Sequence, residues 1–558
     1  MQIFSRSAQR PFIKGRGIAT KKNFFIFEKI SAAETRCLVK MGLSSIKKVL
    51  RNFTCLNPFF STKLLPLMRR QLFSKKSIDQ LRADAESAHG LHRTLGPVQL
   101  FAMGVGAIIG AGIFVLTGLA AREHAGPALT LSFVVAGFGC TFAALCYAEF
   151  AAMVPVAGSA YTYAYATLGE LFAWIIGWDL ILEYAMASSA VAVGWSKYFV
   201  EFVSLFGIHL SPRFFMDPQS YLTSFGGPAL TQAGLWESLR LTFTGQVPFS
   251  CDIVAVGILL IVTAILVKGI RESARVNTAI VFLKLFVVLY VIFAGSKYVD
   301  VSNWHPYFPF GWKGVMTGAS FIFFAYIGFD SVSTHAEEAK NPQRDVPLGI
   351  LLSLAFCTIL YIAVAAVLTG MVKFSEIDIH APIASAFAVH GIKSAVLLVS
   401  FGALAGLTSV LLVMMLSQAR VFLAMARDHL LPYEFFGKIH PRFRTPHYST
   451  MLTGFVVALV AGFTPIGKIA ELVNIGTLLA FAIVCAAVLV LRAKDPGRHR
   501  PFRCPWVPVV PILGIVSNVV LMLSLDNITK LRLVIWLAIG FLIYFTYSRK
   551  KSEFYVSK

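Results

Sequence analysis

Apolar stretches of about 20 residues recur along this chain, and each is long enough to cross about 30 Å of hydrocarbon as a helix. Of the 558 residues, 57% are hydrophobic and only 14% are charged, which leaves too few polar residues to cover a water-soluble protein. A transmembrane β-barrel would show short segments of alternating polarity, and these stretches do not alternate. The sequence therefore predicts an all-α polytopic membrane protein.

The apolar stretches predict 12 transmembrane helices. The sixth stretch is interrupted near Gly328, and its second half carries Asp330, Glu337 and Glu338, so we expect that half to face protein or water. The approximate predicted spans are 98–119, 127–154, 170–204, 253–268, 275–296, 314–340, 347–371, 392–426, 449–464, 467–491, 508–524 and 533–547.

Positive charge is distributed as in a membrane protein rather than a nucleic-acid-binding protein. The net charge is +22, and half of it lies in residues 1–67, which hold 13 Lys and Arg against two acids. With the N-terminus inside, the interior loops beyond residue 97 hold 19 Lys and Arg and the exterior side holds 11, as the positive-inside rule requires. We therefore expect a protein of the inner or plasma membrane, in contact with lipid, with both termini cytoplasmic and no nucleic-acid partner.

The same pattern divides the chain into segments. Residues 1–67 are a basic N-terminal extension that we expect to be disordered, although a transit peptide has a similar composition. We expect residues 68–97 to be a cytoplasmic amphipathic segment and residues 548–558 to be a cytoplasmic tail. Between these two segments lie helices one to five (98–296), helices six to ten (314–491) and helices eleven and twelve (508–547).

The first apolar stretch is rich in glycine, which costs about 1 kcal/mol relative to alanine in a helix interior. Glycines allow close helix packing, or they let a helix break and free its backbone for a ligand. If this helix opens at Gly110–Gly112, the N–H groups of Gly112 and Ile113 suit a carboxylate. The carbonyls of Ile108 and Ile109 would then suit an ammonium. The break thus predicts a site for an α-amino acid zwitterion, and close packing is the alternative.

The sixth apolar stretch contains a second candidate break at Ile327–Asp330. We expect the carbonyls of Phe324, Ala325 and Ile327 to bind the substrate ammonium, and the Phe324 ring to act as an aromatic gate. The alternative for Phe324 is a core aromatic, because the chain has 48 phenylalanines.

Two ionisable residues lie in the middle of predicted crossings, where such groups are usually functional. Lys284 lies about nine residues inside the fifth crossing. We expect it either to exchange a proton or to present its ammonium to carbonyls as a bound cation would. Permanent pairing with Glu183 is the alternative. Glu183, in the third crossing, is expected to contact a cationic side chain, to steady the first helix or to relay a proton, unless it is a neutral acid held by a neighbour.

Five segments together resemble the signatures of the amino acid–polyamine–organocation (APC) transporters, and most resemble the bacterial twelve-helix members of the cationic amino acid transporter subfamily. The resemblance covers about residues 75–548. The segments are Gly104–Phe114, Pro155–Tyr161, Phe324–Asp330, Glu337–Arg344 with Pro347, and Gln418–Arg420 with Met425–Asp428.

The resemblance implies the leucine-transporter (LeuT) fold, in which residues 98–296 and 314–491 form inverted repeats of five helices and two helices follow. It implies alternating access around the two broken helices. Lys284 matches a lysine that takes the place of a sodium ion in proton-coupled relatives. Many relatives have Ser or Thr where this chain has Ala111. The implied substrate-binding residues are Ile108, Ala111, Gly112, Ile113, Glu183, Phe324, Ala325, Ile327 and Met414.

We therefore expect a monomeric, proton-coupled amino acid symporter whose ligands are an L-amino acid and protons. No motif for a nucleotide, a hydrolytic nucleophile or a metal is present, so we expect no cofactor, no metal and no enzymatic activity. An exchanger with a static Lys284 and a membrane amino acid sensor are the alternatives. The substrate side chain stays open, because the resemblance suggests cationic amino acids while bacterial members also take small neutral ones.

Overall fold

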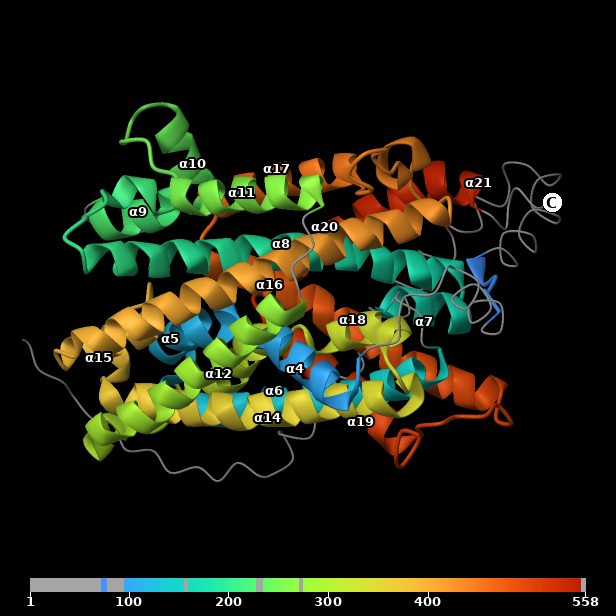
Figure 1. Cartoon of the computed structure of the whole chain (residues 1–558), viewed down its shortest axis with the longest axis horizontal. Helices are drawn as coiled ribbons and strands as arrows, with labels where there is room; N and C mark the ends of the chain where they lie inside the picture. The colour runs from blue at the N-terminus through green and yellow to red at the C-terminus, as the bar shows by residue number, and fades with distance from the viewer. Residues whose placement is uncertain (1–71, 78–94, 155–158, 227–233, 270–273, 553–558) are drawn as a thin grey trace, which may run out of the picture. The chain divides into compact units, whose positions relative to one another are not determined.

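Long apolar helices dominate the computed structural model (Figure 1). It describes residues 72–77, 95–154, 159–226, 234–269 and 274–552. Within these residues the backbone forms helices and turns, apart from an isolated bridge between Leu95 and Ala339. The all-α prediction is therefore confirmed for the described part of the chain. Residues 1–67, most of 68–97, the start of Pro155–Tyr161 and residues 553–558 lie outside it.

Eight helical stretches of the described residues are long and apolar enough to cross a membrane, and four shorter apolar helices accompany them. A helix suits this environment because it satisfies its own backbone hydrogen bonds away from water. The number of crossings stays a prediction. The unbroken apolar helices are α6 (Leu129–Met153), α8 (Glu170–Ser204), α11 (Ile253–Lys268), α12 (Ala274–Gly295), α14 (Pro342–Met371), α16 (Lys393–Arg427), α17 (His447–Phe463), α18 (Ile466–Lys494), α19 (Val509–Ser524) and α20 (Asn527–Ile543).

Two helices are interrupted at the predicted glycines. The first consists of α4 (Pro97–Ile108), η1 (Gly112–Leu116), α5 (Thr117–Ala120) and η2 (Ala121–Ala125), with an extended residue at Ile109. The second consists of α13 (Gly311–Ile322), η7 (Phe323–Tyr326) and η8 (Phe329–Glu338). Gly328 separates its last two parts with a φ of +119°, a conformation that favours glycine.

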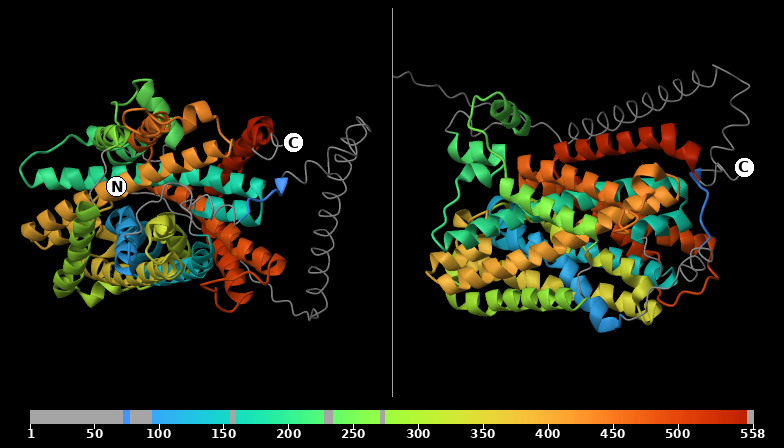
Figure 2. Two further views of the ribbon diagram at one scale, coloured as in Figure 1. Left: turned by 45° about the vertical axis from the view of Figure 1, so that its right-hand side comes forward. Right: turned by 45° about the horizontal axis from the view of Figure 1, so that its top comes forward.

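The interrupted helices lie inside the bundle. The most extensive helix contacts join α14 to α6 and α16 to α8. Figure 1 shows α4 and α5 between these two pairs, the left-hand view of Figure 2 shows the same blue segment between them, and all residues of η1 and α5 are buried. A helix whose backbone is broken needs such cover, because lipid offers its freed N–H and C=O groups no partner.

Short helices lie at the two ends of the bundle in Figure 1. One end carries α9 (Pro218–Phe225), α10 (Leu235–Phe243) and α15 (Pro382–Val389), and the other carries α7 (Ser159–Thr167) and α21 (Arg549–Lys551). The remaining short turns are η3 (Gly126–Ala128), η4 (Pro212–Phe214), η5 (Ser296–Tyr298), η6 (Val301–Trp304), η9 (Phe374–Glu376), η10 (Tyr433–Gly437) and η11 (Tyr544–Ser548).

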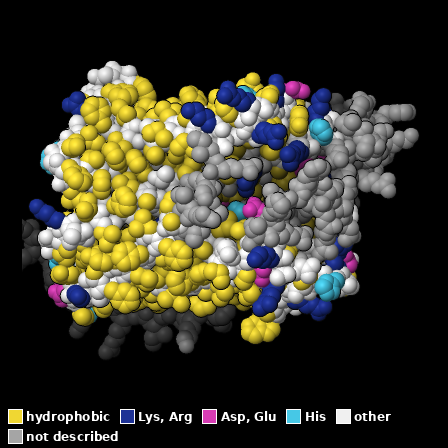
Figure 3. All heavy atoms as spheres, in the orientation of Figure 1, with side chains coloured by type: hydrophobic (Ala, Val, Ile, Leu, Met, Phe, Trp, Pro, Cys, Tyr) yellow, Lys and Arg dark blue, Asp and Glu magenta, His cyan; other side chains and the backbone are white. Residues whose placement is uncertain are grey.

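A broad hydrophobic surface covers much of the face seen in Figure 3, whereas many of its Lys and Arg side chains gather toward the end with α7 and α21. Large apolar side chains such as Leu260, Phe286 and Phe455 are exposed on the helices. An apolar surface this wide fits contact with lipid rather than water. The chain is a multi-pass membrane protein.

Candidate functional site

The two interrupted helices touch at their breaks. A Cβ atom added to Gly112 would lie 2.3 Å from Cα of Ala325, and one added to Gly328 would lie 2.8 Å from the carbonyl oxygen of Ala107. Real Cβ atoms do not come this close to backbone, so only glycine fits at either position. The glycines that suggested breaks in the sequence therefore also bring the two breaks into contact.

The first break exposes backbone donors. Helix α4 ends at Ile108, Ile109 turns to extended geometry with φ −72° and ψ 98°, and η1 begins at Gly112. The first N–H groups of a helix have no partner within it. Among the described residues, the N–H groups of Gly112 and Ile113 donate no hydrogen bond to a backbone carbonyl. Together with the positive end of the helix dipole, they suit an anionic group.

The carbonyl groups of the first break already have partners. The Tyr361 hydroxyl donates to the Ile108 carbonyl at 2.8 Å, and Lys284 Nζ donates to the Ile109 carbonyl at 3.3 Å. A carbonyl oxygen can accept a second bond. The geometry nevertheless weakens the prediction that these two carbonyls are the main acceptors for a substrate ammonium.

The second break offers carbonyls with fewer partners. The Phe324 carbonyl accepts from the Ile327 N–H at 3.2 Å, so this predicted acceptor is partly occupied. Among the described residues, no backbone N–H donates to the carbonyl of Ala325 or Ile327. These two oxygens are therefore open to a further hydrogen bond, and they belong to the broken helix that Gly112 contacts.

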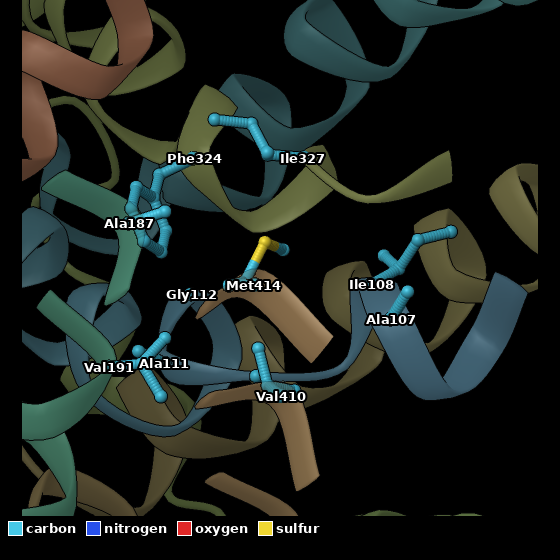
Figure 4. A pocket seen from close by; sticks show the side chains of 11 residues that line it. Ala107, Ile108, Ala111, Gly112, Ala187, Val191, Phe324, Ile327, Val410 and Met414 are labelled. Carbon is cyan, nitrogen blue, oxygen red and sulfur yellow. The ribbon is translucent and has the colours of Figure 1, made fainter. Parts of the chain in front are cut away.

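A pocket lies between the two breaks and the helices α8 and α16. The space between the atoms of its walls is about 270 Å³ when the open space at its mouth is included, and little of this space is enclosed. Figure 4 shows side chains from four elements around it: α4 and η1, α8, the second break, and α16. Its described lining residues are Ala107, Ile108, Gly110, Ala111, Gly112, Ala187, Val191, Phe324, Ile327, Val410 and Met414.

Lys284 of α12 lies beside the first break with 1% of its surface exposed. Its Nζ donates to the Gly106 carbonyl at 2.8 Å as well as to that of Ile109. Its aliphatic stem packs against α16, where a Cβ on Gly406 would lie 3.0 Å from Lys284 Cγ. An ammonium on two carbonyls of a broken helix occupies the place that a metal cation takes in an all-oxygen site.

A family model described as amino acid permease matches residues 95–545 of the chain, and this match spans both breaks, Lys284 and the pocket. The chain belongs to the amino acid permease family. It is a transporter and not an enzyme, and the predicted APC membership is confirmed.

Curated relatives of this permease are close over most of its length. The branched-chain amino acid permease BcaP of Bacillus subtilis is 47% identical over 87% of the chain and 99% of its own length. The methylthioribose transporter of the same organism is 45% identical over 86% of the chain and 98% of its own length. The cationic amino acid transporter 4, vacuolar, of Arabidopsis thaliana is 39% identical over 76% of the chain and 68% of its own length.

Most residues predicted to bind substrate in this permease lie at the pocket. Ile108, Ala111, Gly112, Phe324, Ile327 and Met414 line it. Ile113 and Ala325 are not in the lining, and only their backbone groups, described above, lie at the breaks.

Glu183 is placed apart from these residues. It is 2% exposed on α8, it is not in the pocket lining, and its side chain lies near Thr477 of α18 and the carboxylates of Asp179 and Asp330. The alternative of a permanent Lys284–Glu183 pair is not found, because Lys284 binds the first broken helix instead.

Sequence reasoning missed the side walls of the permease pocket. Ala187 and Val191 are four residues apart on α8, and Val410 and Met414 are four residues apart on α16. Such spacing places each pair on one helix face. Only Met414 was predicted, because small apolar residues within an apolar stretch carry no signal that separates a pocket wall from ordinary packing.

Proposed function

We propose that this permease is a proton-coupled L-amino acid symporter that works by alternating access around the two broken helices. The observation that carries the proposal is the contact of Gly112 with Ala325, which joins a break with open N–H groups, those of Gly112 and Ile113, to a break with open carbonyls, those of Ala325 and Ile327. A carboxylate on the first pair and an ammonium on the second would hold an α-amino acid at both charges. The side chain would then extend into the pocket.

Helix packing supports a LeuT-type inverted repeat, with residues 98–296 and 314–491 as its halves. The first broken helix contacts the second through Gly112 and Gly328. Helices α6, α8 and α11 pack extensively on α14, α16 and α17, respectively. In each case a helix packs against the helix five predicted crossings later, as expected where two equivalent repeats surround a central site.

Lys284 provides a physical route for proton coupling. A charged ammonium has three donors and a full positive charge for the carbonyls of Gly106 and Ile109, whereas a neutral amine has two donors and no charge. Protonation therefore ties α12 to the first broken helix. Release of the proton inside loosens that tie and lets the helix move with its substrate.

The printed names of the relatives agree with an amino acid ligand in two of three cases, branched-chain and cationic, and name methylthioribose in the third. The Lys and Arg side chains at the end with α7 and α21 support a cytoplasmic position for that end. We place the monomer in the inner or plasma membrane, with both termini inside.

Uptake into proteoliposomes without internal amino acid tests the coupling. An inward proton gradient is expected to drive accumulation by the unaltered permease, and Lys284→Ala is expected to abolish the gradient-driven part. Lys297→Ala, an exposed lysine just beyond α12, is the matched control and should change nothing. Uptake that requires internal amino acid would favour an exchanger, and unchanged gradient-driven uptake by Lys284→Ala would contradict the proton role.

A further inference from the structure

We propose that this permease selects amino acids with neutral aliphatic side chains and rejects cationic ones. This inference rests on the proposed function, since it names the side chain of the amino acid whose charges the two breaks hold. It runs against the expectation from the resemblance to cationic amino acid transporters.

Among the described lining residues, no side chain carries a charge or a hydrogen-bonding group that could bind a cationic side chain. The walls outside the two broken helices are Ala187 and Val191 on α8, and Val410 and Met414 on α16 (Figure 4). All four side chains are apolar, and so is every other described lining residue. A lysine ammonium or arginine guanidinium placed here would leave water and gain no partner, whereas a hydrocarbon chain gains by leaving water.

The acid that was expected to meet a cationic side chain is turned to another part of the protein. Glu183 lies one helical turn before Ala187 on α8, but it does not line the pocket. Its neighbours are Thr477 and the carboxylates of Asp179 and Asp330. Glu183 therefore lies beside two other carboxyl groups and not at the pocket, so it gives a cationic side chain there no partner.

The nearest ionisable group to the first break has the wrong sign for a cationic substrate. Lys284 Nζ donates to the carbonyls of Gly106 and Ile109, and Ile109 is next to the lining residue Gly110. In a low-dielectric interior, like charges repel strongly at short distance. A protonated Lys284 therefore disfavours any positive charge that the substrate carries in addition to its α-ammonium.

The sizes of the wall residues indicate which aliphatic side chains fit. Ala111 and Ala187 are small and leave space, while Gly194 lets α8 approach so that a Cβ there would lie 3.5 Å from Ala111 Cβ. Met414 has an unbranched, flexible side chain that adapts to different shapes. This combination suits chains of the size of valine, leucine, isoleucine and methionine.

Isothermal titration of the purified full chain tests the selection directly. L-Leucine, L-valine and L-isoleucine are expected to bind at least about 100-fold more tightly than L-lysine and L-arginine, because the cationic chains lose hydration without a partner. Comparable or tighter binding of lysine would overturn the inference and leave the proposed function standing. Absence of binding by every amino acid would overturn both, and methylthioribose serves as a further ligand in that case.

Substitutions at two wall residues test the same inference from the protein side. Val410→Asp is expected to raise the affinity for lysine relative to leucine at least about tenfold. Val410→Asn, which adds no charge, should weaken the binding of leucine without improving the binding of lysine. Ala187→Leu fills the pocket, so this variant is expected to lose the binding of leucine and to retain the binding of alanine. Unchanged leucine-to-alanine and leucine-to-lysine ratios in these folded variants would overturn the assignment of the walls.

Discussion

Gly112 is the residue at which the two broken helices approach most closely. Gly112 packs against the backbone of Ala325, and a Cβ atom added to Gly112 would lie 2.3 Å from Ala325 Cα. Because the obstacle is backbone rather than a flexible side chain, a substitution must push the two helices apart. The same movement would separate the donors at Gly112 and Ile113 from the acceptors on the second break.

We expect Gly112→Ala to cost about 1–3 kcal/mol of stability, as overpacking does, and to abolish amino acid binding. Gly257→Ala on α11 is the control, because nothing lies within 4 Å of a Cβ there. That change is expected to leave uptake intact and stability equal or higher. Thermal unfolding and radiolabelled uptake measure both effects, and normal binding by Gly112→Ala would show that the breaks need not touch.

His380, in the loop between α14 and α15 and outside the membrane-spanning segments, makes the stability of the protein depend on pH. Burial, with the charges of Lys197 and Arg122, lowers its pKa to about 4 against the pull of Asp378. Between pH 6.5 and about 4 the unfolded chain binds a proton that the folded chain does not, so His380 lowers stability as the pH falls through this window. His380→Gln should flatten the acid side of a stability–pH curve, and exposed His209→Gln should not. An identical curve for His380→Gln would exclude this cause.

The residues at the breaks were predictable because a cluster of glycines, such as that between Gly104 and Gly112, and a charge are both informative inside an apolar stretch. Lys284 and Gly112 stand out in the sequence for that reason. The free carbonyl of Ala325 was predicted, but the occupation of the Ile108 carbonyl by Tyr361 was not, since it joins residues 253 positions apart. The turn of Glu183 toward α18 depended on packing that its own helix does not reveal.

At the scale of elements, apolar length predicted the long helices well. The predicted span 170–204 coincides with α8, and both breaks fall at glycines within apolar stretches. Four short helices between the apolar stretches were not predicted: α7, α9, α10 and α15. They are too short for a pattern of apolar residues with helical spacing to be recognised.

A buried ion pair anchors the loop between α18 and α19. Glu149 of α6 is fully buried and accepts from Arg492 at 3.0 and 2.8 Å and from the Cys504 N–H at 2.8 Å. Arg500, also buried, lies 3.2 Å from the same carboxylate. One acid of α6 thus contacts two arginines, one at the end of α18 and one in the loop that follows it.

Glu149→Gln should destabilise the protein by about 3 kcal/mol, because breaking a buried pair leaves an unpaired buried charge. The control is Glu237→Gln, whose partner Arg240 forms an exposed pair with it at 3.5 Å. That change should alter stability by less than about 0.5 kcal/mol. Thermal unfolding in detergent compares the two, and equal effects would mean that the Glu149 cluster contributes no more than a surface pair.

At the scale of the whole molecule, the membrane class followed from composition, and the family followed from signatures spread over both halves. The packing of α6 on α14 and of α8 on α16 could not be predicted from hydropathy, because lipid-facing and protein-facing apolar residues look alike in sequence. That packing places the pocket at the centre of the bundle, and it makes the two breaks parts of one site.

Recognition of both charges of an amino acid at that site is the central claim, and thermal unfolding with matched ligands tests it most directly. The first ligand is the amino acid that stabilises the protein most. The methyl ester of that amino acid and the amine formed by its decarboxylation both lack the carboxylate, and the matching carboxylic acid without an amino group lacks the ammonium. At about 100 times its dissociation constant the amino acid should stabilise the protein by about 2.7 kcal/mol. Each analogue at the same concentration should give little or no shift, and an analogue that stabilises as well as the intact amino acid would contradict the account.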